Sequence, residues 1–309
     1  MGIIEVHDLK KSFHGRSVLN GISFSVEQGE VFGFLGPNGA GKTTTMRLLL
    51  GLLRPDSGEA LVLGHSLSDH DLLRHKVGVL LENNGLYERL TCRENLDYVA
   101  RLYQVPDPAS RIAELLSFVG LSGSGDQMVG TLSTGMKRKL GLARAILHDP
   151  EILFFDEPSS GLDPEAQHMV RELILRLSER ESITVFLNSH NLDEVQRVCS
   201  RVAILHRGEI QTLDTIQHLT TGTGTTGVRI TLADPGQADL AVTLARSLER
   251  VIEARRDGDR VRVTLEGGSA SPLLGRLVQA GIGIEEAVKV SRTLEEIYLD
   301  VMHQAGAVL

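Results

Sequence analysis

A glycine-rich loop between a strand-like run and a helix-like run constrains this chain more than any other feature. The apolar run Val31–Leu35 precedes the loop, and the apolar run Met46–Leu50 follows it. In this setting the pattern G-x-x-x-x-G-K-T cradles phosphate groups, because glycines let backbone N–H groups turn toward the ligand. The start of the helix adds partial positive charge. The loop therefore predicts a nucleoside triphosphate site made of Gly36, Pro37, Asn38, Gly39, Ala40, Gly41, Lys42, Thr43 and Thr44.

Within this loop, Lys42 and Thr43 have the most specific expected roles. The lysine is expected to reach the β- and γ-phosphates, and the threonine hydroxyl is expected to hold Mg²⁺. A glycine-rich turn with a stray lysine is the alternative. The flanking strand and helix signals make that alternative very weak.

Length and charge narrow the class of protein. A chain of 309 residues can form one large domain or two ordinary ones. Its formal charge of −8 argues against a dedicated nucleic-acid binder. No apolar run approaches the ~20 residues that cross a bilayer, and the first residues lack the hydrophobic core of a signal peptide. We expect a cytoplasmic chain whose two lone cysteines, Cys92 and Cys199, are inert.

The first 220 or so residues alternate strand and helix signals, which predicts an α/β layer architecture. Near-continuous apolar runs indicate strands that are buried on both faces. Thr91–Glu94 predicts a capping box that opens a helix to about Gln104. Asp163 predicts an N-cap, with Pro164 in the first turn. The expected strands are Val31–Leu35, Ala60–Leu63, Val77–Leu81, Ile152–Phe155, Ile183–Leu187 and Val202–Leu205.

The composition then changes to a threonine- and glycine-rich stretch, for which we predict a linker over residues 221–227. A smaller α+β domain is expected over residues 228–309. Asp257 and Gly258 mark a hairpin between two strand-like runs. The order strand, helix, strand, strand, helix, strand, helix suggests a ferredoxin-like domain. Its expected elements are strands at Val228–Leu232, Ile252–Arg256, Arg260–Leu265 and Ile284–Val290, and helices over 238–248, 271–281 and from Thr293.

Carboxylates and small polar residues elsewhere complete a candidate catalytic site. Asp156 and Glu157 end a buried apolar strand, where Mg²⁺ needs an aspartate and water needs an orienting carboxylate. Ser133 and Gly135 open a helix-like run, which suits an anion site or a simple N-cap equally well. The segment Ser160–Asp163 suits a turn and N-cap. His190 follows a strand and is placed to reach a γ-phosphate, although a lone histidine is more often structural.

These features together resemble the ATP-binding subunit of ABC transporters over about residues 3–215. Gly36–Thr44 looks like Walker A, Ile152–Glu157 like Walker B and Leu132–Met136 like the signature motif. Ser160–Asp163 resembles the D-loop, and His190 the switch histidine. The resemblance implies a P-loop ATPase domain over residues 1–220 with a helical subdomain at about 84–148.

The resemblance also implies roles for individual residues. It implies a head-to-tail homodimer that holds two ATP molecules, with Ser133 and Gly135 of one chain facing the γ-phosphate bound by Lys42 of the other. Glu157 would be the catalytic carboxylate, and Asp156 and Thr43 would serve Mg²⁺. His190 would steady the γ-phosphate and the attacking water. Asp163 would belong to the nucleotide site.

The chain departs from the family pattern in three places. Phe13 stands where a tyrosine usually stacks on adenine; it keeps the stacking face, and an ordinary core phenylalanine is the alternative. Thr134 and Met136 replace the commonest signature residues, and we still expect activity. Glu82 replaces the Q-loop glutamine. Its carboxylate can hold Mg²⁺ or water, and its charge can alter the pH or metal dependence of turnover.

The C-terminal segment Thr293–Leu299 looks like that of drug-resistance exporters, whose ATPase and membrane subunits are separate chains. We therefore expect a peripheral subunit on the inner face of the cell membrane that powers export of a drug, lipid or other amphiphile. Tyr87 is the best candidate for contact with the membrane subunit; Tyr98 and Tyr103 suit either that contact or the core of the helical subdomain. The C-terminal domain is expected to be a dimer clamp rather than a ligand sensor.

Two other functions remain open at this level. A soluble ABC-type ATPase of translation or DNA repair needs no membrane partner, but translation types usually carry two ATPase units and repair types carry long coiled coils. This chain shows neither feature. A non-hydrolysing nucleotide switch requires Glu157 to be dispensable for turnover.

Overall fold

The computed structural model describes residues 2–67, 73–81, 84–221, 225–267, 269–290 and 292–307. The chain divides into two compact units. The first comprises Met1–Asp214 and Val301–Leu309, and the second comprises Thr215–Asp300. The division falls near the boundary predicted at about residue 220.

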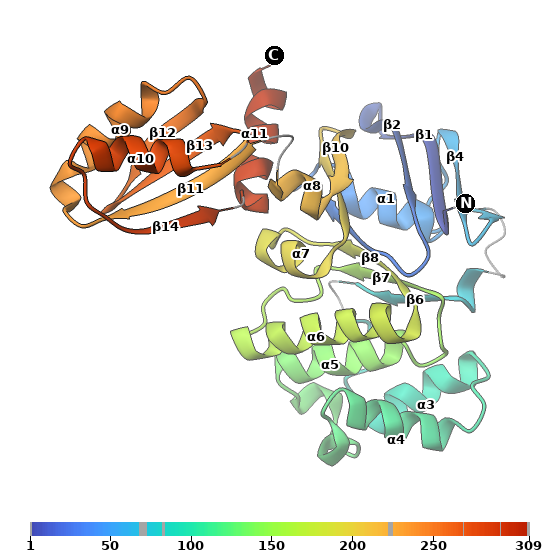
Figure 1. Ribbon diagram of the computed structural model, residues 1–309. Coiled ribbons are helices and arrows are strands. Elements are labelled where there is room, and N and C mark those ends of the chain that lie inside the picture. The colour runs from blue at the N-terminus through green and yellow to red at the C-terminus, as the bar shows by residue number, and fades with distance from the viewer. Residues whose placement is uncertain are drawn as a thin grey trace. The chain divides into compact units, whose positions relative to one another are not determined.

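The centre of the first unit is a six-stranded sheet in the order β10-β9-β3-β8-β7-β6 (Figure 1). The pairs β3–β8, β3–β9, β7–β8 and β6–β7 are all parallel. All six strands predicted for this region are present, five of them in this sheet and the sixth as β4 of a second sheet. The bounds of the central strands are β3 Val31–Leu35, β6 Val77–Leu80, β7 Ile152–Asp156, β8 Thr184–Asn188, β9 Arg201–His206 and β10 Glu209–Thr215.

The first unit also contains a second, four-stranded sheet. Of its strands, only β4 corresponds to a strand predicted from the sequence, Ala60–Leu63. Its order is β2-β1-β4-β5, with antiparallel pairs. The register of β1 against β2 shifts at three places, and Asp8 has a positive φ of 46°. These irregularities break the alternation by which a strand is recognised in sequence. The strands are β1 Ile4–Phe13, β2 Arg16–Val26, β4 Ser57–Val62 and β5 His65–Ser66.

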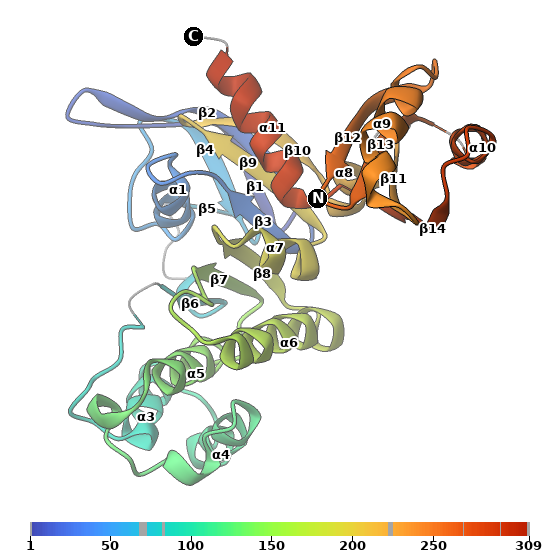
Figure 2. The ribbon, with the colours of Figure 1, turned by 90° about the vertical axis from the view of Figure 1, so that its left-hand side faces the viewer.

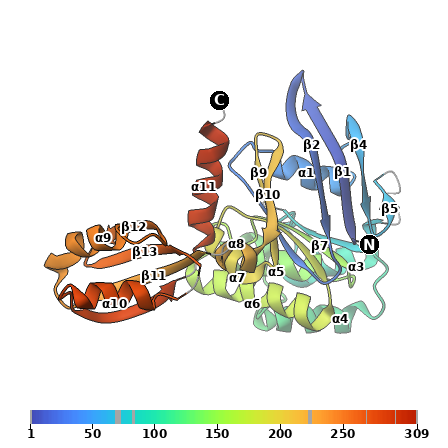
Figure 3. The ribbon, with the colours of Figure 1, turned by 45° about the horizontal axis from the view of Figure 1, so that its top comes forward.

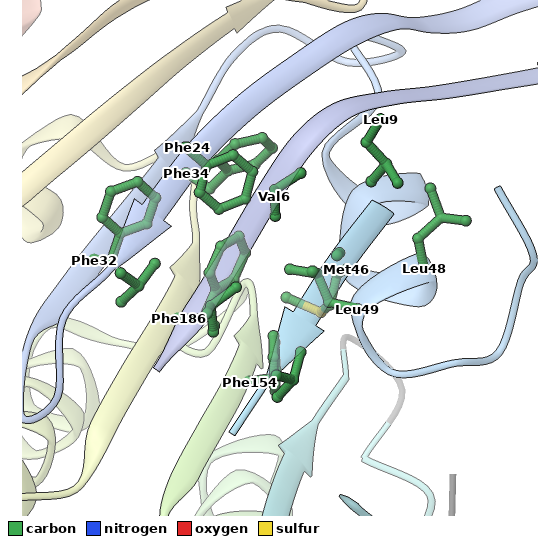
Figure 4. Packing of buried hydrophobic residues seen from close by; sticks show 14 of the residues in the cluster. Val6, Leu9, Phe24, Phe32, Phe34, Met46, Leu48, Leu49, Phe154 and Phe186 are labelled. Carbon is green, nitrogen blue, oxygen red and sulfur yellow. The ribbon is translucent and has the colours of Figure 1, made fainter. Parts of the chain in front are cut away.

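An aromatic core joins the central sheet to the second sheet and fixes the base of the phosphate loop. Phe32 and Phe34 of β3 contact Phe24 of β2 and Phe186 of β8, with ring centroids 5.4–5.8 Å apart. Phe154 of β7 adds a further ring 5.5 Å from Phe186. Figure 4 shows Met46 and Leu49 of helix α1 (Lys42–Leu49) on the side of Phe154 and Phe186, and Leu48 belongs to the same buried cluster. The helix that follows the loop is therefore anchored by buried apolar side chains.

Helices form the remainder of the first unit. The predicted capping box is present, because Thr91 Oγ1 accepts from Glu94 N at 3.1 Å and Glu94 Oε2 accepts from Thr91 N at 2.8 Å. Helices α3, α4 and α5 contact one another and form the helical subdomain, which two views show beyond α6 (Figures 1 and 2). The helices are α3 Cys92–Leu102, α4 Pro108–Phe118, α5 Thr134–Ala145, α6 Pro164–Glu181 and α7 Leu192–Val198.

The second unit is an antiparallel sheet in the order β12-β13-β11-β14 with two helices on it (Figure 3). The alternating residues Val228, Ile230, Val261 and Val263 are buried and share one core with α9 and α10. The predicted hairpin at Asp257 is confirmed. The elements are α8 Ile216–Thr221, β11 Thr225–Leu232, α9 Ala238–Arg246, β12 Val251–Asp257, β13 Arg260–Glu266, α10 Ser271–Gln279 and β14 Ile284–Val290. Helix α11, Leu294–Ala307, begins in this unit, and from Val301 on it belongs to the first unit.

The structure differs from the predicted linker at residues 221–227. Residues 222–224 lie outside the described residues, but β11 already begins at Thr225. Gly227 pairs with Thr264 on one side and Val290 on the other. A side chain there would meet Val290 O at 2.2 Å, so this glycine serves a close approach of strands rather than a flexible connection.

Candidate nucleotide-binding and catalytic site

The phosphate loop lies where β3 ends and α1 begins, as predicted. Lys42 is buried, and its Nζ donates to Gly36 O at 2.6 Å and to Pro37 O at 3.2 Å. A Cβ at Gly36 would lie 2.2 Å from Leu205 O, so only glycine fits between the loop and β9. The lysine is thereby held across its own loop by two backbone carbonyls, and phosphate oxygens can replace them as acceptors.

A cavity of about 510 Å³ opens above this loop. The exposed Thr43 lines it from the first turn of α1. Two arginines line it as well, although sequence reasoning did not select them: Arg16 starts β2, and Arg207 lies in the turn between β9 and β10. Both cations face a loop that was predicted to bind polyphosphate, which favours an anionic occupant. Only the unpredicted β1–β2 hairpin brings Arg16 there.

Electrostatics link the loop to the end of β7. Burial lowers the pKa of Lys42, while the negative charges of Glu157 and Asp156 raise it. The two carboxylates therefore lie close enough to act on the ammonium group. The strand order explains this arrangement, because β8 lies between β3 and β7 and their carboxyl ends share one edge.

Asn188, at the end of β8, connects the two neighbouring strands. It pairs in register with Phe34 of β3 and with Asp156 of β7. Asn188 Nδ2 donates to Asp156 Oδ1, and Glu157 N donates to Asn188 O at 2.8 Å. The buried Asn188 Oδ1 has no hydrogen-bond partner within the described part of the chain. The only feature of the sequence that points to this role is the position of Asn188, two residues before His190.

Glu157 and His190 are in contact. Only 2.7 Å separates His190 Nδ1 from Glu157 Oε2. Glu157 has a left-handed backbone, with φ at 53°, which turns its side chain away from the strand direction. The histidine side chain is exposed, whereas the glutamate side chain is mostly buried.

Arg138 of α5 holds the backbone of this turn and was not selected by sequence reasoning. It is 4% exposed. Its guanidinium donates to Pro158 O at 2.7 Å, to Asp156 O at 3.0 Å and to Glu157 O. It also reaches Leu81 O at 2.8 Å and Asn84 Oδ1 at 2.7 Å. One buried cation thus joins the helical subdomain to the strand end that carries both carboxylates.

The remaining predicted residues have the following environments. Ser133 is exposed and caps α5, with Met136 N donating to its Oγ at 3.2 Å; Gly135 lies in the first turn of the same helix. Asp163 caps α6, with Ala166 N donating to its Oδ1 at 2.8 Å. Phe13 is 39% exposed, does not line the cavity, and lies under Lys11 Nζ at 5.5 Å. Glu82 lies outside the described residues.

The surface of the helical subdomain presents two tyrosine rings. Tyr87 and Tyr98 are each half exposed and meet edge to face with centroids 5.2 Å apart. The buried Asn95 fixes the loop of Tyr87 through a bond from Tyr87 N at 2.8 Å and another to Tyr87 O at 3.0 Å. Tyr103 instead stacks on His148 with ring centroids 4.0 Å apart. Of its two predicted roles, this contact agrees with packing within the protein rather than with contact to a membrane subunit. No helix in the described part of the chain has the length and apolar content to cross a membrane.

Comparison with known proteins supplies relatives over most of the chain. A family model described as "ABC transporter" matches residues 19–160. An uncharacterised ABC transporter ATP-binding protein, YhcH of Bacillus subtilis, is 31% identical over 97% of this chain and 95% of its own length. The bacitracin transport ATP-binding protein BcrA of Bacillus licheniformis is 41% identical over 67% of this chain and 68% of its own length.

Other relatives match about two thirds of the chain. The Nod factor export ATP-binding protein I of a Rhizobium species is 42% identical over 66% of this chain and 68% of its own length. One relative from Nostoc is longer, and this chain spans 58% of its length at 48% identity over 62% of this chain. A solved structure of an ATP-binding subunit of an ABC transporter is 30% identical over 70% of this chain and 91% of its own, with a TM-score of 0.63.

One of these relatives is similar along nearly the whole length of both chains. The chain belongs to the family of ABC transporter ATP-binding proteins and is an ATPase of that family.

Proposed function

We propose that Glu157 and His190 form the hydrolytic centre of this ATPase. The 2.7 Å contact between them, at the sheet edge that adjoins Lys42, is the observation that carries the proposal. Lys42 would exchange its two carbonyl partners for β- and γ-phosphate oxygens. Glu157 would orient a water molecule and take its proton, while the His190 imidazole holds that carboxylate in place.

The phosphate loop Gly36–Thr44 would supply the remaining phosphate contacts. Phe13 would stack on adenine. It is exposed enough to do so, although it stands outside the cavity walls. Arg16 and Arg207 would add positive charge around the polyphosphate.

The residues also fit a magnesium ion. Mg²⁺ prefers oxygen ligands, and the candidate donors are the Thr43 hydroxyl and the Asp156 carboxylate. Asn188 Oδ1, beside Asp156, has no hydrogen-bond partner among the described residues and would be a further oxygen ligand. The ion would neutralise phosphate charge during transfer. Glu82, proposed on sequence alone, would be a further ligand for the ion or for water.

A second copy would complete the site. The exposed Ser133 and the half-buried Gly135 lie at the start of α5, and Asp163, the last residue of the D-loop-like segment, caps α6. Backbone N–H groups at a helix start favour an anion. We propose a head-to-tail homodimer in which this surface faces the γ-phosphate bound by Lys42 of the other copy.

Transport would be the use of this ATPase activity. Two relatives support this use: one is named for bacitracin transport and the other for Nod factor export, and they are 41% and 42% identical over 67% and 66% of this chain. We propose that the chain lies on the inner face of the cell membrane and powers export of a drug, lipid or other amphiphile through a separate membrane subunit. The half-exposed Tyr87 and Tyr98 would contact that subunit.

The second unit would be a ferredoxin-like domain that clamps the dimer. Its strand order, with β11 and β13 in the centre and antiparallel pairs throughout, supports that topology. A domain boundary close to residue 220 accompanies this proposal. A small-ligand sensor is the second possibility for the same unit.

The variant Glu157→Gln tests the hydrolytic centre. The amide cannot take a proton from water, so we expect ATP turnover to fall to near zero while ATP binding and dimer formation persist. Turnover near that of the wild type would refute the assigned role and favour another base. Lys42→Ala is the binding control and should lose most of the affinity for ATP, because its ammonium contacts the phosphates directly.

Membrane recovery tests the transport assignment. After cell lysis, the full-length chain should sediment with membranes when its partner is coexpressed. Sedimentation with ribosomes or with DNA would instead support the soluble alternative.

A further inference from the structure

Glu194, in the first turn of α7, is a buried carboxylate that neither the phosphate loop nor the proposed hydrolytic pair explains. It is 2% exposed. Ser159 Oγ donates to its Oε1, and Ser189 Oγ donates to its Oε2 at 3.1 Å. Its own N–H donates to Asn191 Oδ1 at 3.1 Å. Both carboxylate oxygens are therefore committed to hydroxyl groups from two different loops.

Those two loops carry the proposed hydrolytic pair. Ser159 follows Glu157 by two residues, and Ser189 directly precedes His190. The hydroxyl of Ser189 also accepts from Asn191 N at 3.1 Å, so the chain is held on both sides of the histidine. Together with the 2.7 Å contact between His190 and Glu157, these bonds close a ring around the turn that presents both groups.

Burial of the Glu194 carboxylate is energetically unfavourable, and the hydrogen bonds from Ser159 and Ser189 offset this cost. Burial raises the pKa of Glu194, and the negative charge of Glu157 raises it further; the hydrogen bonds from Ser159 and Ser189 lower it. Removing a carboxylate from water is costly unless both of its oxygens accept hydrogen bonds. The serine hydroxyls are thus required for this carboxylate, and each serine is fixed by it in return.

We propose that Glu194 is a positioning residue for ATP hydrolysis, because it holds the loops of Glu157 and His190 at contact distance through Ser159 and Ser189. This inference rests on the proposed roles of Glu157 and His190. Among the described residues, the side chain and N–H of Glu194 form hydrogen bonds with Ser159, Ser189 and Asn191, and none of these partners belongs to the phosphate loop.

The test compares turnover with nucleotide affinity in the full-length chain. In Glu194→Ala we expect kcat for ATP to fall by roughly 10- to 100-fold, as expected for a displaced catalytic group. The Kd for the non-hydrolysable analogue AMP-PNP with Mg²⁺ should stay within about twofold, because binding energy comes mainly from the phosphate loop. Glu194→Gln should recover part of kcat, since its amide oxygen still accepts one serine hydroxyl and its NH₂ can donate to the other serine.

Glu30→Gln is the matched control. Glu30 is also buried, at 8% exposure, and binds Arg201 Nη1 at 3.2 Å and Ser200 Oγ at 3.4 Å. It precedes β3, and so lies at the opposite edge of the sheet from the phosphate loop. The Glu30→Gln substitution should lower the midpoint temperature of thermal unfolding and leave kcat per folded molecule unchanged.

Two results would overturn the inference. One is a kcat within about twofold of the wild type in Glu194→Ala. The other is a loss of AMP-PNP affinity as large as the loss of kcat in a variant that still folds, because Glu194 would then support the nucleotide site as a whole rather than the hydrolytic pair. If Glu194→Ala does not fold, the double variant of Ser189→Ala and Glu194→Gln replaces it. Both substitutions act on the hydrogen bond between Ser189 and Glu194, so their effects on kcat should be non-additive. Additive effects would contradict the proposed hydrogen-bonded ring. Failure of the hydrolytic pair itself is read separately, from Glu157→Gln.

Discussion

Replacing Arg138 by methionine should lower the free energy of unfolding of the first unit by about 3–5 kcal/mol, the range for breaking a buried charged network. Arg138 is 4% exposed, and among the described residues its guanidinium donates to five oxygen atoms. Methionine fills much of the same space but donates no hydrogen bond. The five acceptors are Leu81 O, Asn84 Oδ1, Asp156 O, Glu157 O and Pro158 O.

The magnitude follows from what remains after the substitution. A hydrogen bond from a charged donor contributes about 1.5–3 kcal/mol on average. A simple sum over five bonds exceeds the stability of most domains, so the bonds cannot be additive. Two effects make the loss smaller than this sum. Some of the acceptor oxygens can form hydrogen bonds with water as the turn relaxes, and the variant has no guanidinium that must be removed from water on folding. The figure of about 3–5 kcal/mol reflects these offsets.

The neighbouring residue Lys137 provides the control. Its Nζ lies 2.8 Å from Glu88 Oε1 at an exposed ion pair, for which about 0–1 kcal/mol is typical. Urea unfolding followed by circular dichroism should show a large shift for Arg138→Met and almost none for Lys137→Met. Arg138→Lys should recover only part, because an ammonium has three donors and no planar fork. A shift for Arg138→Met of less than about 1 kcal/mol would refute the reasoning.

Two other perturbations follow from the structure. Gly36→Ala should lose most of its affinity for ATP, because the added Cβ would lie 2.2 Å from Leu205 O. Gly39→Ala should retain more affinity, because the added Cβ has no neighbouring side chain or distant backbone within 4 Å. Equal ATP affinities of the two variants, measured by titration, would contradict this account. Burial lowers the pKa of His148 from its usual 6.5, so the unfolded chain binds this proton more readily and the wild type should lose stability as pH falls below about 6.5. His148→Gln should lack that component, and parallel curves of thermal midpoint against pH would exclude it.

Local sequence chemistry predicted those elements whose signals lie within a few residues. The strand Val31–Leu35, the capping box at Thr91 and the N-cap at Asp163 are present as expected. The hairpin at Asp257 and the strand Ile284–Val290 are also present. In each case turn residues or uninterrupted apolar runs specify the element without reference to the remainder of the fold.

Other features depend on contacts between distant segments and were missed. Strands β1 and β2 carry bulges and a glycine at position 21, so their alternation is broken. Gly227 belongs to a central strand because Thr264 and Val290 pair with it, which composition alone cannot indicate.

The candidate site divides in the same way. Its motif residues were predicted from spacing, whereas Arg138, Asn188 and Glu194 act through tertiary hydrogen bonds. An arginine, an asparagine and a glutamate of these kinds are common in any sequence. Only the fold shows which acceptors and donors they meet.

Cross-linking between two copies tests the central claim most directly, namely that a second chain closes over the nucleotide. Asn38 lies exposed in the phosphate loop, and Ser133 is exposed at the start of α5. A chain with cysteines at both positions, in the Glu157→Gln background, is predicted to form a cross-linked dimer between positions 38 and 133 in ATP and Mg²⁺, and not without nucleotide. ATP binding without any cross-link between these positions would contradict the account.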